Sequence, residues 1–381
     1  MKYYIIVGEA SGDLHGSKLI EGIKKRDKDA DFRFWGGDKM IEACGNETSL
    51  VKHIKETSIM GFIEVVKNLR TILSQISYCK KDILNYAPDV VILVDYAGFN
   101  LKIAKFAKLH NIKTYYYIAP KVWAWKENRV KKIKKWVDEL FVIFPFEVEY
   151  FKKWGIEAHY FGNPIMDAIE EKNAVLSSKE EFIKENNLDN KKKIALLPGS
   201  RVHEINYNLS FILNVAKEFK DYQFVICGVN WIDEKVYRKL ISSVEGVNVE
   251  LLFDKTYETL AHSDAAIVTS GTATLETALL KVPEFSCYWV KPITAFILSF
   301  FLKLKWVTLV NIIMQREVIA ELLYKNMVVE KGVEELRAIL PGGSKHDRLM
   351  ADYDDLEQKM GDVGASKRVA HKIVSLLETK N

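Results

Sequence analysis

The feature that most constrains this chain is a series of short apolar runs, each followed by a longer segment with helical spacing. The clearest run is Val90–Asp95 (VVILVD), in which every residue before the aspartate is aliphatic. Such runs are typical of parallel strands that are buried on both faces of a sheet. Ser17–Arg26 and Leu101–His110 have helical spacing. This alternation predicts a doubly wound α/β fold.

The predicted strands fall into two series, separated by the polar stretch 170–193. The first series is Lys2–Val7, Phe32–Trp35, Val90–Asp95, Lys113–Ile118, Glu139–Phe144 and Glu157–Phe161. The second series is Lys193–Leu197, Gln223–Cys227, Val247–Leu252, Ala265–Thr269 and Glu284–Tyr288.

A chain of 381 residues is also too long for one typical domain core. We therefore predict two Rossmann-like domains that face each other across a cleft, over residues 1–165 and 166–360. A C-terminal helix within residues 361–381 is expected to pack on the first domain or on a partner chain in a homodimer.

Composition favours a cytoplasmic protein. The four cysteines, Cys44, Cys79, Cys227 and Cys287, are widely spaced, which is typical of free thiols in a reducing compartment. The apolar run at the N-terminus is too short for a signal peptide, and no stretch reaches the roughly 20 apolar residues of a membrane span. The net charge of +4 is small and argues against nucleic acid as a partner.

Two polar turns follow strands of the first domain, where ligands of open α/β sheets bind. The turn Gly8–Asp13 (GEASGD) leads into a helix whose first amides can face an anion or a sugar. Its side chains Glu9, Ser11 and Asp13 form a candidate acceptor-side loop, with a purely structural turn as the alternative. Asp95 is expected to point into the cleft as a general base; a cap for the next helix is the alternative.

Two turns in the second domain predict a nucleotide-diphosphate site. In Pro198–Arg201 (PGSR), the planar fork of Arg201 can bind a diphosphate, although a surface arginine is an equal alternative. In Ser270–Glu276 (SGTATLE), Ser270 or Thr272 can cap a helix whose amides, with Gly271, face a pyrophosphate. Glu276 can accept hydrogen bonds from both ribose hydroxyls, and a capping box without a ligand is the alternative.

Neither a metal site nor a cofactor is predicted. The pairs Asp29/Asp31 and Asp352/Asp354 are expected to lie in solvated loops, and the histidines are not spaced as a metal set. Without a metal, Arg201 and a helix N-terminus must neutralise the leaving diphosphate.

Two segments suggest contact with a membrane surface. Lys121–Trp136 combines three tryptophans with seven basic residues. Lys291–Trp306 (KPITAFILSFFLKLKW) is too short to span a bilayer but suits an interfacial helix with basic flanks. A core helix is the alternative. The predicted membrane contacts are Phe296, Leu298, Phe300, Phe301 and Trp306.

Eight motifs, in this order, resemble those of the lipid-A-disaccharide synthases, a family of inverting glycosyltransferases with the two-domain GT-B architecture. They are GEASGD at 8–13, MGFIEV at 60–65, PDVVILVDYAGFN at 88–100, VWAW at 122–125, FGNP at 161–164, LLPGSR at 196–201, SGTATLE at 270–276 and VNII at 310–313.

The resemblance implies a reaction in which UDP-2,3-diacylglucosamine donates its sugar to 2,3-diacylglucosamine 1-phosphate, without a metal, at the inner face of the bacterial inner membrane. It implies that Asp95 is the base, that Arg201 and the residues of the SGTATLE turn bind the donor, and that Asn311 belongs to the active site. Some members carry a second aspartate where this chain has Gly98, so Asp95 must act without it.

Two alternatives share this architecture. One is a UDP-N-acetylglucosamine 2-epimerase, which needs the nucleotide site but no lipid surface. The other is a transferase that makes peptidoglycan lipid intermediates, whose first glycine-rich turn is expected to differ from GEASGD.

Overall fold

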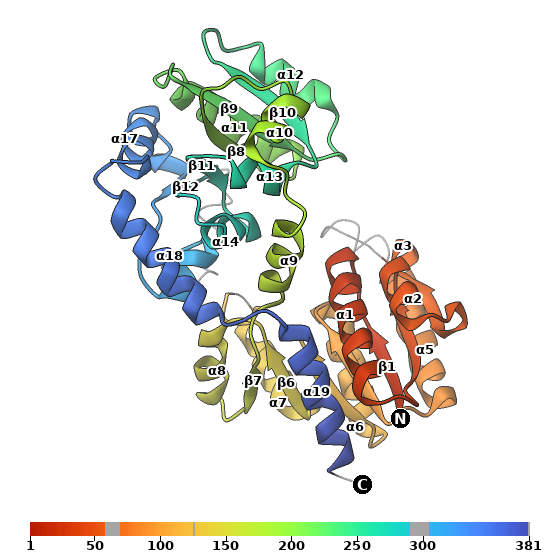
Figure 1. Ribbon diagram of the computed structural model, residues 1–381. Coiled ribbons are helices and arrows are strands. Elements are labelled where there is room, and N and C mark those ends of the chain that lie inside the picture. The colour runs from red at the N-terminus through yellow and green to blue at the C-terminus, as the bar shows by residue number, and fades with distance from the viewer. Residues whose placement is uncertain (58–68, 125, 290–304, 380–381) are drawn as a thin grey trace. The chain divides into compact units, whose positions relative to one another are not determined.

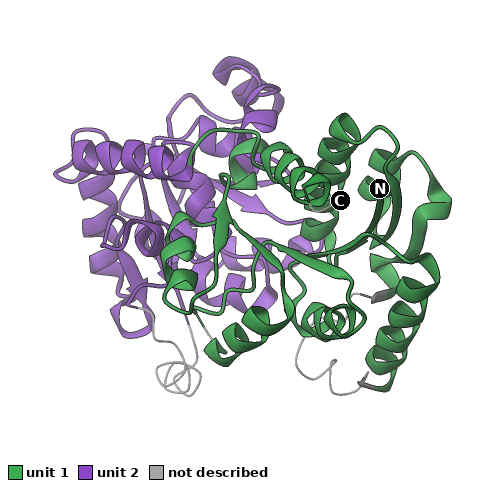
Figure 2. Ribbon diagram, turned by 90° about the horizontal axis from the view of Figure 1, so that it is seen from below, with its two compact units in different colours: residues 1–167, 361–381 green, residues 168–360 purple. Residues whose placement is uncertain are grey.

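The computed structural model describes residues 1–57, 69–124, 126–289 and 305–379, which form two compact units (Figure 1). Unit 1 comprises residues 1–167 and 361–381, and unit 2 comprises residues 168–360 (Figure 2). Each unit is built around a parallel sheet with its own helices, so the predicted class of two Rossmann-like domains is confirmed.

Among the described residues, unit 1 forms a seven-stranded sheet in the order β3-β2-β1-β4-β5-β6-β7. Its strands are Lys2–Ile6 (β1), Asp31–Gly36 (β2), Leu50–His53 (β3), Val90–Val94 (β4), Lys113–Tyr117 (β5), Glu139–Val142 (β6) and Ala158–Tyr160 (β7). The order reverses between β1 and β4, where Ile6 pairs with Leu93. Every residue of β4 is fully buried, as its continuous apolar run predicts.

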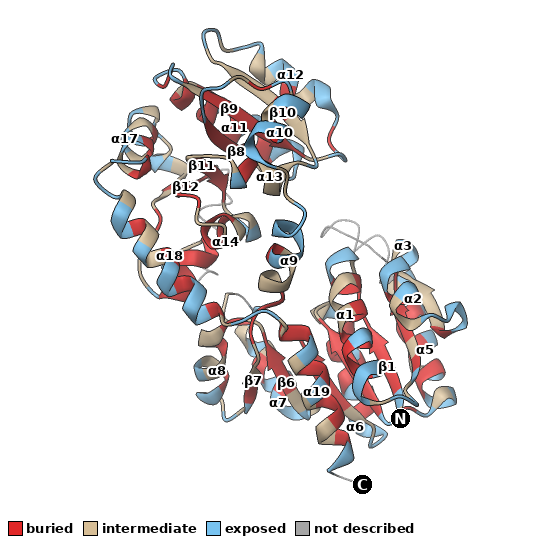
Figure 3. Cartoon of the chain, in the orientation of Figure 1, coloured by how far each residue is buried: buried red, intermediate tan, exposed pale blue. Residues whose placement is uncertain are grey.

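Helices cover both faces of this sheet. They are Ala10–Arg26 (α1), Asp38–Cys44 (α2), Ile54–Thr57 (α3), Leu69–Tyr86 (α5), Ala97–Leu109 (α6), Val130–Trp136 (α7), Pro145–Lys152 (α8) and Ala365–Glu378 (α19). One face carries α1 and α19, and the other carries α5 to α8. Figure 3 shows the buried strands between helices whose outer surfaces are exposed.

The C-terminal helix α19 completes the core of unit 1. Ile373 and Val374 are fully buried in the same cluster as Ile20 and Ile23 of α1. The two helices touch closely at Gly22, because a Cβ atom there would lie 2.6 Å from the Cβ of Ala370. This helix therefore covers part of the sheet although it follows β7 by about two hundred residues of sequence.

Unit 2 contains a six-stranded parallel sheet among the described residues, in the order β10-β9-β8-β11-β12-β13. Its strands are Lys192–Leu197 (β8), Tyr222–Gly228 (β9), Val249–Phe253 (β10), Ala265–Thr269 (β11), Glu284–Tyr288 (β12) and Glu321–Leu323 (β13). Its helices are Lys179–Glu185 (α10), Val202–Ala216 (α11), Glu234–Ile241 (α12), Thr256–Ala261 (α13), Thr272–Leu279 (α14), Leu309–Met314 (α16), Val329–Ile339 (α17) and His346–Met360 (α18). Helix α9 (Pro164–Asn173) spans the boundary between the units, and the order of strands reverses between β8 and β11.

Candidate active site

The turn after β4 holds Asp95 at the switch point of unit 1. Asp95 and Tyr96 both adopt left-handed backbone conformations, with φ of 45° and 46°. Such residues persist only where their surroundings hold them. The Asp95 N–H donates to the Tyr117 carbonyl at 3.1 Å, and its carbonyl accepts from the buried Asn100 amide at 2.8 Å and from the Tyr116 hydroxyl. The backbone of this aspartate is therefore fixed from three sides.

The carboxylate of Asp95 is half-buried, and its pKa is raised above the ordinary value. Burial is the largest cause, the negative charge of Glu9 adds to it, and Lys121 acts in the opposite direction. A carboxylate with a raised pKa is a stronger base once it is ionised. The environment thus suits Asp95 to proton transfer.

The GEASGD turn lies beside Asp95 at the same switch point. Gly8 is required by close packing, because a Cβ atom there would lie 2.2 Å from the ring of Tyr96. Glu9 is half-buried and Ser11 is exposed, and the Ser11 hydroxyl donates to the Glu9 carboxylate at 3.2 Å.

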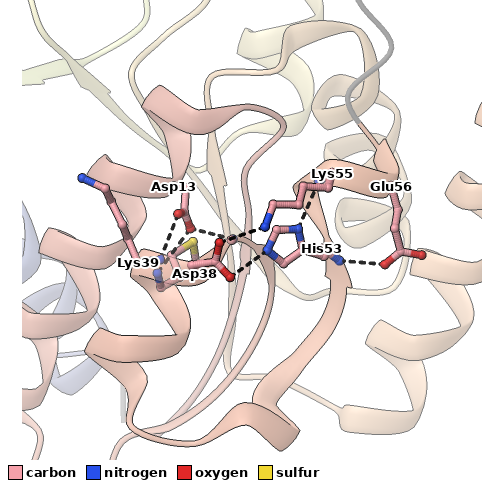
Figure 4. A network of polar contacts seen from close by, with 8 residues as sticks. Asp13, Asp38, Lys39, His53, Lys55 and Glu56 are labelled. Carbon is pink, nitrogen blue, oxygen red and sulfur yellow. Dashed lines mark hydrogen bonds and ion pairs between the residues drawn. The ribbon is translucent and has the colours of Figure 1, made fainter. Parts of the chain in front are cut away.

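The side chain of Asp13 makes its hydrogen bonds to another helix. Its buried carboxylate accepts from the backbone amides of Gly37, Lys39 and Met40 at the start of α2, as Figure 4 shows. This cap joins α1 to α2, so the structure assigns Asp13 a structural contact, in contrast to the substrate contact expected from the sequence.

In unit 2, the PGSR turn follows β8 at the switch point. Gly199 has a φ of +115°, and a Cβ atom there would lie 2.8 Å from Glu204. Glu204 accepts from the Ser200 amide and the Arg201 guanidinium, both at 3.1 Å. The Arg201 side chain remains 68% exposed. The guanidinium is therefore oriented by Glu204 while most of it can still meet a ligand.

The SGTATLE turn follows the neighbouring strand β11. The N-cap of α14 is Gly271, which differs from the predicted cap by Ser270 or Thr272, and no side chain in the described part of the chain caps this helix. Ser270 instead donates to the carbonyl of Val307, and Thr272 is exposed. Among the described residues, α14 therefore has no capping box, and no side chain there accepts from its first amides, which is the arrangement that suits an anion.

Glu276 lies one turn into α14, and the Tyr257 hydroxyl donates to its Oε1 at 2.6 Å. One carboxylate oxygen is therefore held by α13, which orients the side chain. A carboxylate fixed in this way can still accept a hydrogen bond from a ribose hydroxyl.

Asn311 supports the site without a free group for a ligand. It is fully buried in α16, and its amide donates to the Ile319 carbonyl and to Glu321, both at 2.9 Å. Its oxygen accepts from the amides of Val318 and Ile319. These four bonds use the hydrogen-bonding capacity of the side chain.

Two residues that contact the unit 2 turns, Asn208 and Trp231, were not predicted. Asn208 of α11 is fully buried and ties the ends of three strands together by donating to Pro198 O and Thr269 Oγ1 and by accepting from Trp289 N. The available signal was a second polar residue one turn after Glu204 on a mainly apolar helix. Trp231 donates to Ser200 O at 3.0 Å and leaves its side chain 71% exposed, and no pattern predicts it.

Most of the predicted membrane segment lies outside the described residues, including Phe296, Leu298, Phe300 and Phe301. Of this set the structure describes Trp306, which is half-buried beneath Lys305, with the Nζ atom 4.8 Å from the ring centre. Within the described ranges, no helix combines the length and apolarity that a membrane crossing needs.

The described residues contain no group of three or more His, Cys, Asp or Glu side chains arranged for a metal ion. The second D-x-D pair lies in α18, in contrast to the solvated loop predicted, and Asp352 is held by Arg316 through both carboxylate oxygens at 2.7 and 2.8 Å.

In comparisons with known proteins, the matching family model and the relatives carry the same family name. The family model described as "Lipid-A-disaccharide synthetase" matches residues 3–374. The lipid-A-disaccharide synthase of Syntrophus aciditrophicus is 34% identical over 380 residues, covering 98% of this chain and 97% of that protein. That of Persephonella marina is 35% identical over 390 residues, covering 98% and 99%.

The fold is also similar to solved structures of lower identity. UDP-GlcNAc 2-epimerase from Neisseria meningitidis, bound to UDP-GlcNAc, has a TM-score of 0.63 at 16% identity and covers 100% of both chains. A putative UDP-N-acetylglucosamine 2-epimerase from Listeria monocytogenes has a TM-score of 0.66 at 14% identity, covering 100% of this chain and 97% of that one. At these identities the likeness concerns the fold alone.

Proposed function

This chain belongs to the lipid-A-disaccharide synthase family of glycosyltransferases, and we propose that it joins two acylated sugars. The donor is UDP-2,3-diacylglucosamine and the acceptor is the 6-hydroxyl of 2,3-diacylglucosamine 1-phosphate. The products are the β-1,6-linked lipid A disaccharide 1-phosphate and UDP.

Asp95 acts as the general base. It takes the proton of the 6-hydroxyl while that oxygen attacks the anomeric carbon of the donor from the face opposite to UDP. The new C–O bond forms as the bond to the diphosphate breaks, which inverts the configuration. The observation that carries this role is the half-buried Asp95 carboxylate at the β1–β4 switch point, whose pKa is raised by burial and by Glu9.

Unit 2 binds the donor. Arg201 and the uncapped first turn of α14 offer donors to the diphosphate, whose negative charge increases as it leaves. Glu276, oriented by Tyr257, accepts from the ribose. Ser270, Gly271 and Thr272 shape the turn, and Asn311 maintains the fold around it.

The reaction is tested by mass spectrometry of the purified protein with both acylated substrates and EDTA. We expect the tetraacyl disaccharide phosphate and UDP from the wild type, and a loss of about 10²–10⁴-fold in rate for Asp95→Asn. The proposal fails if the wild type makes no disaccharide with or without magnesium. Conversion of UDP-N-acetylglucosamine to its 2-epimer would then favour the epimerase.

We further propose that the protein works peripherally on the cytoplasmic face of the inner membrane through the segment 291–306. Its sequence alternates aromatic and aliphatic residues with flanking lysines. Replacing Phe300 and Phe301 by serine should reduce sedimentation with anionic vesicles while leaving the melting temperature unchanged. A fall in melting temperature with vesicle binding retained would contradict this role.

A further inference from the structure

Glu147 is a fully buried carboxylate in the first turn of α8. Its Oε2 accepts from the backbone amides of Ile143 and Phe144 at 3.2 and 3.0 Å, and its Oε1 accepts from the Trp123 indole N–H at 2.9 Å. A helix cap needs one such oxygen, and it can be supplied at the surface. Because burial of a carboxylate is costly, the second oxygen and its bond to Trp123 call for a further explanation.

Trp123 lies in the loop that follows β5, at the carboxyl edge of the unit 1 sheet. Besides the bond to Glu147, its ring packs edge-on against Phe144 and Phe146, with centroids 6.2 and 5.0 Å away. The loop is therefore held to α8 by one polar and two aromatic contacts. Since β5 is the neighbour of β4, this loop belongs to the same edge of the sheet as Asp95.

Lys121 lies between this anchor and the proposed base: the loop begins after Tyr117, whose carbonyl accepts from the Asp95 N–H at 3.1 Å, and it reaches Trp123 two residues after Lys121. Its positive charge lowers the pKa of Asp95 and also that of Glu147, although burial raises the latter to about 7. Its Nζ lies 5.9 Å from the ring centre of Phe144. Among the described residues, the other ionisable groups that act on these carboxylates are Glu9 and Tyr116 at Asp95 and Tyr160 of β7 at Glu147.

We infer that Glu147 is a positioning residue for glycosyl transfer: its hydrogen bond to the Trp123 indole fixes the loop that holds Lys121 beside Asp95. The inference rests on the proposed function in taking Asp95 as the base. Trp123 and Glu147 need not touch either substrate, because they act by holding in place the loop that carries this cation.

The hydrogen bond can be tested by two substitutions that preserve shape. Trp123→Phe keeps an aromatic ring but removes the N–H. The wild-type carboxylate accepts from the Trp123 indole through one oxygen and from the backbone amides through the other. Glu147→Gln has a single acceptor oxygen, so it can accept from only one of these two groups. Trp136→Phe, the same substitution in α7 of the same unit, is the matched control.

Each test variant should lose about ten- to a hundredfold in kcat with little change in KM, as expected for a misplaced catalytic environment. The acid limb of kcat/KM should move to higher pH, since Asp95 loses its cationic neighbour. The double variant should be no worse than the more impaired single variant, and Trp136→Phe should behave as wild type. A purely structural role would lower the melting temperature without moving the acid limb.

If Trp123→Phe keeps wild-type kcat and acid limb, the inference is wrong, even if Glu147→Gln fails to fold. The bond itself is tested without substrate by the NMR signal of the Trp123 indole N–H, which should shift with pH near 7 in the wild type and not in Glu147→Gln. An indole signal that does not respond to pH would overturn the assignment. An inactive wild type with a responsive indole would instead reject the proposed reaction.

Discussion

At the scale of single residues, the charge of the proposed base depends on two neighbours of opposite sign. Glu9 raises the pKa of Asp95 and Lys121 lowers it, while burial raises it further. The base must be ionised to accept a proton, so activity should rise with pH through the pKa of Asp95.

Substitutions at these neighbours should therefore move the acid limb of kcat/KM in opposite directions. Glu9→Gln removes a negative charge, which lowers the pKa of Asp95 and moves the limb to lower pH. Lys121→Met removes a positive charge and moves it to higher pH. Steady-state rates over a pH series with the acylated substrates provide the measurement. Two shifts in the same direction would show that Asp95 does not produce the limb.

Arg201 is largely exposed, and its ion pair with Glu204 is worth little for stability. We expect Arg201→Ala to lose a charge-assisted contact of about 1.5–3 kcal/mol, mostly in kcat, because the charge of the diphosphate grows as it leaves. Arg238→Ala in α12, which removes another exposed paired arginine, is the control. Equal kinetics for the two variants would remove Arg201 from the mechanism.

Sequence alone predicted that Asp95, Arg201 and the α14 turn lie in the segments after continuous apolar strands, and the structure has them there. It could not predict that Asp13 caps α2, since the amides that it accepts from come 24 to 27 residues later and are brought there by the fold. Likewise, the sequence around Asn311 is compatible with an amide that binds a ligand and with a buried amide that makes hydrogen bonds within the fold. Only tertiary contacts distinguish the two.

At the scale of elements, the strands that sequence missed are both at sheet edges. The residues of β3 are all half-buried and β13 has three residues, so neither makes a continuous apolar run. Central strands such as β4 are buried on both faces and were predicted to within one residue. The edge strands β7 and β10 were predicted, so an edge position weakens the signal without removing it.

The contact between the β1–α1 turn and the β4–α6 turn leads to a further prediction. Gly8→Ala would place a Cβ atom 2.2 Å from the Tyr96 ring and displace the turn that carries Asp95. We expect a loss of about 1–3 kcal/mol in stability together with reduced kcat.

The matched control is Gly98→Ala in α6, where an added Cβ meets nothing within 4 Å. This change should be neutral or stabilising by up to about 1 kcal/mol. Urea unfolding and steady-state kinetics of both variants provide the comparison. If Gly8→Ala is as stable and as active as Gly98→Ala, close packing at Gly8 does not hold the turn.

At the scale of the whole molecule, the two units differ in how the chain builds them. Unit 2 is one continuous stretch, whereas unit 1 needs residues 361–381 to complete the face of its sheet that carries α1. The sequence predicted the C-terminal helix, but its amphipathic pattern does not identify the surface that it covers. That surface is defined by Gly22 and Ala370, whose small side chains let α1 and α19 approach.

A chain that ends at residue 360 should therefore lose unit 1 and keep unit 2. The missing helix would expose the cluster of which Val369, Ile373, Val374 and Leu377 are part. Burial of four such side chains is worth roughly 6–12 kcal/mol, which is comparable to the whole stability of a domain. Calorimetry should show one unfolding transition fewer than in the full chain, while UDP still binds.

A milder variant distinguishes packing from a general effect of truncation. Ile373→Ala should lower the stability of unit 1 by about 2–5 kcal/mol, whereas Lys367→Ala, on the exposed side of α19, should have little effect. UDP affinity, measured by titration calorimetry, should be the same in both variants because the turns proposed to bind the donor, PGSR and SGTATLE, belong to unit 2. If Ile373→Ala weakened UDP binding as strongly as it destabilised the protein, the stability of the donor turns would depend on unit 1, and the two units would not fold independently.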